Sequence, residues 1–253
     1  MKSATTLIYD GSFNGFLTAV FVAFEEKLHV VDIQKIGQCP NGLFSGTQPV
    51  FTQIDKAKRV WHGLRNKNHN AMANIYFAYL SGAEGVEPML YGHIQKLMSL
   101  SKGESLEPSQ DNLYLEQLAR KVGREKYRME AHVQFQISKD HIQYALIDPE
   151  YDVLPLISKH FRARHHQTCW LIHDLRRQYG IFYNLDHVEM VTLALGKYAP
   201  AKTYKKDAGA QGTNRLQELI NRSGIQGLVK PKLHPRTLVA PPRDHGNIVK
   251  EAV

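Results

Sequence analysis

The residues best suited to bind an anion are arginines that recur every fourth position in one segment of the chain. Arg120, Arg124 and Arg128 follow this spacing, which places all three on one face of a helix. The apolar residues of the same segment fall on roughly the opposite face: Leu115, Leu118, Val122 and Met129. Exposed arginines in a row suit an anionic partner, most commonly nucleic acid. The row therefore predicts a nucleic-acid-binding face, with an ordinary solvated helix face as the simpler alternative.

A single carboxylate, Glu125, interrupts this basic row beside the apolar stripe. In that position it can hold Arg124 or Arg128 through a bidentate ion pair. Arginines held in a fixed geometry recognise phosphates better than mobile ones do. We therefore expect Glu125 to orient the arginines for binding.

A second basic patch lies between residues 56 and 67, where five of twelve residues are Lys or Arg. Lys58, Arg59 and Arg65 are its candidate contacts to nucleic acid. Trp61 lies among them, and basic groups interleaved with an aromatic ring suit single-stranded nucleic acid. The alternative, which we favour for Trp61, is that its ring packs inward as part of the protein core.

Other candidate site residues stand alone rather than in rows. Asp10 lies where a predicted strand leads into a helix, a position at which free backbone N–H groups can take an anion. A turn followed by a helix cap explains the same residues more simply. We expect Asp10 and Asp174 to orient basic partners, and Arg164 and Arg177 to contact nucleic acid.

Metal binding finds little support in the spacing of the potential ligands. Asp148, Asp152 and Asp174 would suit Mg²⁺ if the fold brought them together, but their spacing matches no nuclease signature. The histidines include no pair with a third ligand at useful spacing, and Cys39 and Cys169 lie 130 positions apart. We therefore expect neither a metal nor a cofactor.

The composition limits the class of protein further. The chain has 253 residues, of which 43% are hydrophobic, which is enough for a globular core. No apolar run approaches the roughly 20 residues that span a bilayer, and the N-terminus lacks the apolar region of a signal peptide. We expect a cytoplasmic protein that does not associate with membranes.

Most of the positive charge lies near the C-terminus. Residues 200–253 hold ten Lys and Arg against four Asp and Glu, a net charge of +6 out of +8 for the whole chain. They also hold five of the 11 prolines and a single helical pattern, at residues 214–221. We expect a core domain at residues 1–199 and a basic extension, with little core of its own, at residues 200–253.

Hydrophobic periodicity predicts helices in the first half and paired strands in the second. A strand at residues 5–9 and an irregular connection at 30–46 accompany the first helices, and Asp152 and Pro155 suit the start of a later one. The helices are expected at 13–24, from about 56, and at 71–80, 86–100, 112–130, 154–161 and 186–195. The strands are expected as a hairpin, 133–137 with 142–146, and as a second pair, 170–173 with 181–183. This order predicts an α+β fold in which a helix-rich first half packs on a small, mainly antiparallel sheet.

Several sequence motifs resemble a bacterial family described as DNA metabolism or DNA repair proteins. These motifs are Tyr9–Phe21, Val60–Leu64, Val122–Met129, Asp148–Phe161 and Trp170–Arg176, and the resemblance as a whole covers about residues 5–190. Members of that family tend to accompany a radical-SAM protein, and some are fused to a uracil-DNA glycosylase-like domain. Two features differ from the family: Tyr127 replaces a usual His, and the family's C-terminal motif is not evident after Pro200. If that His were catalytic, a tyrosine with a pKa near ~10 would replace it poorly at neutral pH.

The residues and the resemblance together imply a function in nucleic-acid metabolism. We expect a DNA-binding protein of a repair or modification pathway that acts beside a radical-SAM partner, which would supply the iron–sulfur chemistry. One alternative is a hydrolase or glycosylase that acts on damaged DNA with its own active site. A second alternative is a protein-interaction scaffold without affinity for nucleic acid.

Overall fold

The computed structural model describes residues 4–37, 46–101, 109–193 and 209–231. Helices and strands are mixed along the chain, which confirms the expected combination of α and β structure. The described residues form two compact units, the first ending at Gly123 and the second beginning at Arg124. The division does not coincide with the predicted boundary at residue 199.

The first unit is built on a parallel sheet, which the sequence analysis did not predict. Its strands lie in the order β2-β1-β3. Their bounds are β1 (Ala4–Tyr9), β2 (His29–Lys35) and β3 (Gly46–Pro49). The prediction of an irregular connection at 30–46 was therefore wrong over β2. Helix α1 (Phe13–Glu25) joins β1 to β2, and the Ser12 side chain caps it by accepting a 2.9 Å hydrogen bond from the Gly15 backbone N–H.

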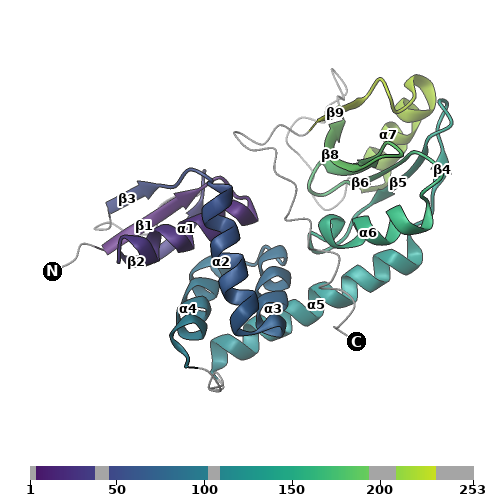
Figure 1. The fold of residues 1–253 in the computed structure, drawn as a ribbon. Coiled ribbons are helices and arrows are strands. Elements are labelled where there is room, and N and C mark those ends of the chain that lie inside the picture. The colour runs from purple at the N-terminus through teal and green to yellow at the C-terminus, as the bar shows by residue number, and fades with distance from the viewer. Residues whose placement is uncertain (1–3, 38–45, 102–108, 194–208, 232–253) are drawn as a thin grey trace. The chain divides into compact units, whose positions relative to one another are not determined.

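Three further helices pack together beside this sheet (Figure 1). They are α2 (Ile54–Lys67), α3 (His69–Leu80) and α4 (Val86–Ser99). Trp61 of α2 is only 3% exposed, and its ring meets Phe13 of α1 edge-on at a centroid distance of 5.5 Å. Phe13 also contacts Tyr76 of α3 at 4.8 Å. Trp61 is therefore a core residue that joins the helices, as the sequence favoured.

The boundary between the two units lies within helix α5 (Gln110–His132), whose residues from Arg124 onward belong to the second unit. The second unit contains the larger of the two sheets. Its strands run in the order β4-β5-β6-β7-β8-β9, and all neighbours are antiparallel except β5 and β6. Their bounds are β4 (Gln136–Ile137), β5 (Gln143–Ile147), β6 (Trp170–Asp174), β7 (Tyr179–Tyr183), β8 (Val188–Leu193) and β9 (Val229–Pro231). Both predicted strand pairs are confirmed. The predicted helix at 186–195 was wrong, because this segment pairs with β7 as β8.

Helices α6 (Leu154–Arg164) and α7 (Gly209–Ser223) cover opposite faces of this sheet. Successive residues of a strand point to opposite faces. Trp170 contacts Phe161 of α6 at a centroid distance of 6.3 Å, whereas the adjacent Leu171 belongs to the apolar cluster that includes Leu216 of α7. The two helices therefore enclose the central strand β6 on both sides.

The described part of the predicted C-terminal extension belongs to this core. Four of its side chains are at most 7% exposed and pack against the sheet: Leu216, Ile220, Ile225 and Leu228. Asp140 holds the turn after α7, because its carboxylate accepts hydrogen bonds from the backbone of Ile225 at 2.7 Å and of Gln226 at 2.8 Å. The prediction of an extension with little core was therefore wrong over 216–231, while residues 200–208 and 232–253 lie outside the described part.

Burial alone would raise the pKa of the Asp140 carboxyl group. The hydrogen bonds from Gln226, Ser138 and Ile225 favour its charged form more strongly, so the pKa is lowered overall. The charged carboxylate thus ties the β4–β5 turn to a segment more than 80 residues later in the chain.

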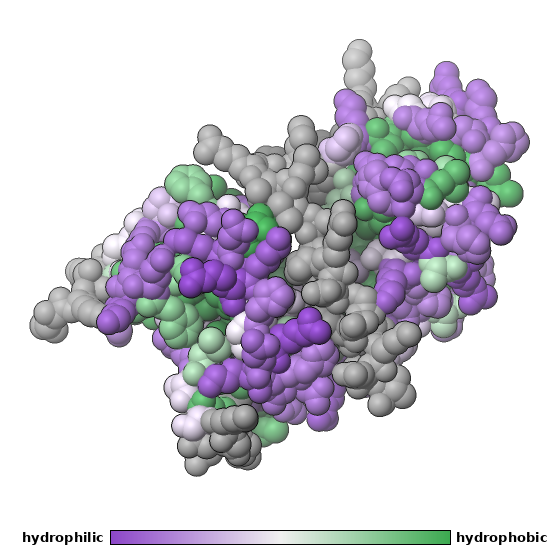
Figure 2. Space-filling view, viewed as in Figure 1, coloured by the Kyte–Doolittle hydropathy of each residue, from purple (hydrophilic) through white to green (hydrophobic). Residues whose placement is uncertain are grey.

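None of the described helices combines the length and the apolar composition needed to cross a membrane. On the face shown in Figure 2, hydrophilic residues predominate and hydrophobic ones form small separate groups. Scattered apolar residues of this kind are normal for a protein surface.

Candidate nucleic-acid interface

A short loop after β5, at residues 148–152, is the centre of a polar cluster in the second unit. The side chain of Arg177, in the turn after β6, supports this loop by hydrogen bonds to its backbone. Its Nη1 donates to the Pro149 carbonyl at 3.1 Å, and its Nη2 donates to the Glu150 carbonyl at 2.7 Å. Arg177 was expected to contact nucleic acid. Its guanidinium N–H groups donate to the loop backbone, so Arg177 positions the 148–152 loop.

Asp174 holds Arg177 from the end of β6. Its side chain is fully buried, and Oδ2 accepts from Arg177 Nη1 at 2.9 Å. Oδ1 accepts from the backbone N–H groups of Arg176 at 2.8 Å and of Arg177 at 2.9 Å. A buried carboxylate needs such partners, because an unpaired buried charge is strongly unfavourable. Asp174 is thus paired with a basic residue, Arg177, and its orienting role at a nucleic-acid site stays a prediction.

Glu125 supports the 148–152 loop from the side of α5. Its side chain is 8% exposed, and Oε1 accepts both from Arg128 Nη2 at 2.5 Å and from the Glu150 backbone N–H at 2.9 Å. The Arg128 side chain remains 55% exposed. A largely buried carboxylate therefore fixes an exposed arginine next to the loop, as expected from its place beside the apolar stripe.

Arg124 lies one turn before Arg128, is exposed, and makes no hydrogen bond or ion pair with the described residues. Its charge acts on Tyr151 of the same loop. Burial and the neighbouring Glu150 and Glu125 raise the pKa of the Tyr151 hydroxyl, whereas Arg124 opposes this increase. Arg124 is thus an unneutralised cation beside the 148–152 loop.

The rim of the loop carries carboxylates as well as arginines. Arg176 Nε donates to Asp148 Oδ1 at 3.0 Å with both side chains more than half exposed, and this hydrogen bond raises the pKa of Arg176. The Tyr179 hydroxyl donates to Asp152 Oδ1. The N-cap residue of α6 is Val153, without a side-chain cap hydrogen bond, so the predicted cap at Asp152 was wrong. The cluster therefore holds five carboxylates (Glu125, Asp148, Glu150, Asp152 and Asp174) against four arginines (Arg124, Arg128, Arg176 and Arg177). Its anion-binding potential rests on Arg124 and on the exposed side of Arg128.

The remaining candidate residues lie elsewhere in the second unit or belong to the first unit. Arg164 is at the last residue of α6, at the end opposite the 148–152 loop, and 11 helical residues separate the ends by about 16 Å. Lys58, Arg59, Arg65 and Arg120 belong to the first unit, as does Asp10. Arg120 is 77% exposed and forms a 3.5 Å pair with Glu116.

Asp10 organises the turn before α1. Its Oδ1 accepts from the Ser12 backbone N–H at 2.9 Å and from the Ser12 hydroxyl at 2.6 Å, while Oδ2 accepts from the Thr52 hydroxyl at 2.8 Å. The simpler of the two alternatives, a turn with a helix cap, accounts for these contacts. Among the residues that the structure describes, no group of three or more His, Cys, Asp or Glu side chains is arranged to hold a metal ion.

His173, the residue before Asp174, was not among the predicted site residues. Its side chain is 1% exposed, and neither ring nitrogen has a hydrogen-bond partner among the described residues. Burial lowers the pKa of the imidazole to about 4. The only indication in the sequence is its place in the Trp170–Arg176 motif, within a strand whose five residues are all buried.

We expect the second unit to lose stability in mild acid because of His173. The unfolded chain binds a proton to this residue near pH 6.5, whereas the folded protein does so only near pH 4. Stability is therefore retained above pH 6.5 and falls as the pH decreases toward 4, with a loss of about 2 kcal/mol at pH 5. Urea unfolding of the wild type and of His173→Leu at pH 5 and pH 7.5 measures this difference. An equal pH dependence in the two proteins would contradict the assignment.

These features define a mixed α/β protein whose second unit carries a loop held by buried carboxylates and arginines. A family model described as a domain of unknown function, DUF4130, matches residues 84–219, which is more than half of the chain. The chain therefore belongs to the DUF4130 family. The match includes α5, the 148–152 loop and the whole of β6. No curated protein matches the chain.

Proposed function

We propose that the protein binds nucleic acid in a DNA repair or modification pathway, through Arg124, Arg128 and the adjoining 148–152 loop. The observation that carries the proposal is the Glu125–Arg128 pair, in which a carboxylate 8% exposed orients an arginine 55% exposed. Arginine has five N–H donors, so those not directed at Glu125 remain available to phosphate oxygens. Arg124 adds an unneutralised charge one helical turn away.

The pathway and the radical-SAM partner rest on the motif resemblance. Three motif segments of that resemblance contribute to this unit. Arg124, Glu125 and Arg128 lie within one, the 148–152 loop within a second, and Asp174 and Arg176 within a third. A role beside a radical-SAM protein would leave this chain to bind the substrate nucleic acid while the partner supplies the iron–sulfur chemistry. The alternative function, a hydrolase or glycosylase with its own active site, would need an accessible catalytic group. His173 and Asp174 are 1% and 0% exposed, so they do not offer one in this conformation.

The direction in which Glu125→Gln changes the affinity for DNA distinguishes recognition by an oriented arginine from general electrostatic attraction. Removing a negative charge should increase affinity for DNA if charge alone matters. We expect the opposite, because Arg128 would lose the partner that fixes it. Arg124→Ala and Arg128→Ala should each weaken binding and reduce the slope of log affinity against log salt by about 1. Fluorescence anisotropy over a salt series measures both quantities.

Glu116→Gln is the matched control for this experiment. It removes the same charge from the same helix, at a side chain that is 46% exposed and paired with Arg120. It should leave affinity unchanged or raise it slightly. Tighter binding by both glutamine variants would show that the arginine row is an ordinary charged face, and absence of salt-dependent binding by the wild type would remove the proposed function.

A further inference from the structure

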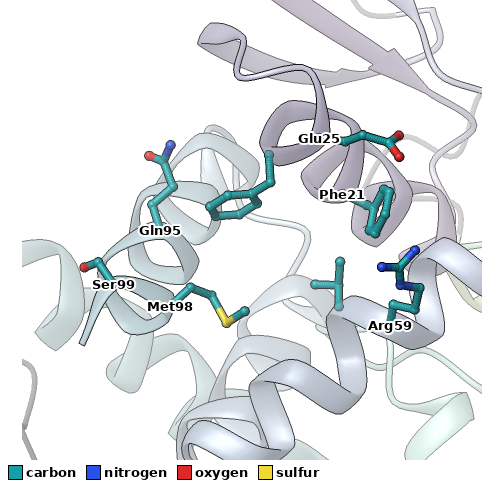
Figure 3. A pocket seen from close by; sticks show the side chains of 8 residues that line it. Phe21, Glu25, Arg59, Gln95, Met98 and Ser99 are labelled. Atoms are coloured by element: carbon teal, nitrogen blue, oxygen red, sulfur yellow. The ribbon is translucent and has the colours of Figure 1, made fainter. Parts of the chain in front are cut away.

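The first unit contains a cleft that the arginine row does not use. It lies between α1, α2 and α4 and has a volume of about 660 Å³, within the roughly 300–1,000 Å³ of small-ligand sites. In Figure 3, Phe21 and Arg59 lie together on one side, and Gln95, Met98 and Ser99 lie on the other. The full lining is Phe21, Phe24, Glu25, Arg59, Val60, Gln95, Met98 and Ser99.

The two phenylalanines give the cleft aromatic surface of different kinds. Phe21 is covered by cations, with Lys56 Nζ at 5.1 Å and the Arg59 guanidinium carbon at 4.9 Å from its ring centroid. Phe24 is 42% exposed, although its ring contacts Tyr91 at 6.2 Å. A large exposed aromatic ring in a concave site is free to stack on a planar ligand.

The charges around the cleft favour an anionic ligand. Glu25 is neutralised by Lys56, whose Nζ lies 2.7 Å from Glu25 Oε2. Arg59 makes no ion pair with the described residues, so its charge is available at the mouth of the cleft. The amide nitrogen of Gln95 donates to the Tyr91 hydroxyl at 2.8 Å, which leaves the amide oxygen of Gln95 as an acceptor.

We propose that this cleft binds an unpaired nucleobase of single-stranded nucleic acid, stacked on Phe24, with the adjoining phosphate on Arg59. This inference rests on the proposed nucleic-acid function and adds the form of the substrate. Aromatic stacking combined with a basic groove is the usual means of binding single strands, because every base offers a flat face. Base-paired DNA would keep its bases out of reach of such a cleft.

A single-stranded oligonucleotide containing 2-aminopurine provides the test, because stacking quenches the fluorescence of this base. We expect quenching by the intact protein, with its loss and about a tenfold weaker affinity in Phe24→Ala. Phe24→Trp should restore both, since indole offers a larger stacking surface. Phe51→Ala removes a phenylalanine that is 67% exposed outside the cleft, and it should leave quenching unchanged.

Lys58→Ala and Arg59→Ala form a second matched pair on α2. Both remove one exposed charge, but only Arg59 lines the cleft. Arg59→Ala should reduce quenching, while Lys58→Ala should reduce only the salt-dependent affinity. Equal quenching in the wild type and Phe24→Ala, with binding intact, would contradict base stacking in the cleft, while the proposed nucleic-acid function would stand. A wild type that binds neither single-stranded nor duplex DNA would overturn both.

Discussion

Arg177→Ala is expected to lower the free energy of unfolding of the second unit by about 3 kcal/mol or more. The substitution leaves Asp174, which is fully buried, without its charged partner, and leaves the carbonyl groups of Pro149 and Glu150 without their donor. Breaking a buried pair by removing one member costs more than the pair itself contributes, because the remaining charge is uncompensated. Equilibrium urea unfolding gives the difference.

The neighbouring arginine is the control. Arg176 and its partner Asp148 are 52% and 57% exposed, and exposed pairs contribute little, so Arg176→Ala should change stability by less than about 1 kcal/mol. Adding Asp174→Asn to Arg177→Ala should recover part of the loss, because the amide removes the unpaired charge. Equal effects of the two arginine substitutions would show that Arg177 is a surface group after all.

Removing residues 200–253 is expected to abolish cooperative unfolding of the second unit. The deletion takes away four buried side chains of α7 and the segment after it, each of which contributes roughly 1.5–3 kcal/mol. Their combined contribution is comparable to the total stability of a domain, about 5–15 kcal/mol. The deletion also removes β9 and so exposes the edge of β8.

The two tryptophans make this experiment specific to one unit. Trp61 lies in the first unit and Trp170, which is fully buried, lies in the second. In a Trp61→Phe background, the fluorescence of Trp170 reports on the second unit alone. A chain ending at Pro231 retains every described element and should unfold cooperatively. A normal transition of Trp170 in the chain that ends at residue 199 would support a dispensable extension instead.

Local patterns predicted the parts of the fold that depend on local interactions. Ser12 caps α1 as expected, and the alternating apolar residues around the turn at 139–141 form the β4–β5 pair. The position of Glu125 beside the apolar stripe predicted an ion pair with Arg124 or Arg128, and the structure pairs it with Arg128. In each case the partners lie within a few residues of one another in the chain.

The strands and contacts that the sequence did not predict depend on residues that are distant from one another in the chain. β2 is a strand because it pairs in parallel with β1, and the two are separated by the whole of α1. Val188–Leu193 has apolar residues compatible with either a helical or a strand period, and only its pairing with β7 and β9 decides between them. Arg177 could be assigned to a loop, but its role depends on two carbonyl groups more than 20 residues earlier.

The late position of α7 and β9 also affects how the chain folds during synthesis. Tyr144 and Ile220 belong to one apolar cluster, although they lie 76 positions apart in the sequence. Translation delivers residues one after another, at about 5–20 per second, so the sheet from β4 to β8 emerges seconds before its covering helix. During that interval its apolar face and the edge of β8 are open to non-native partners, including other nascent chains. The second unit is thus expected to fold slowly and to reach its native state only after α7 and β9 have been synthesised.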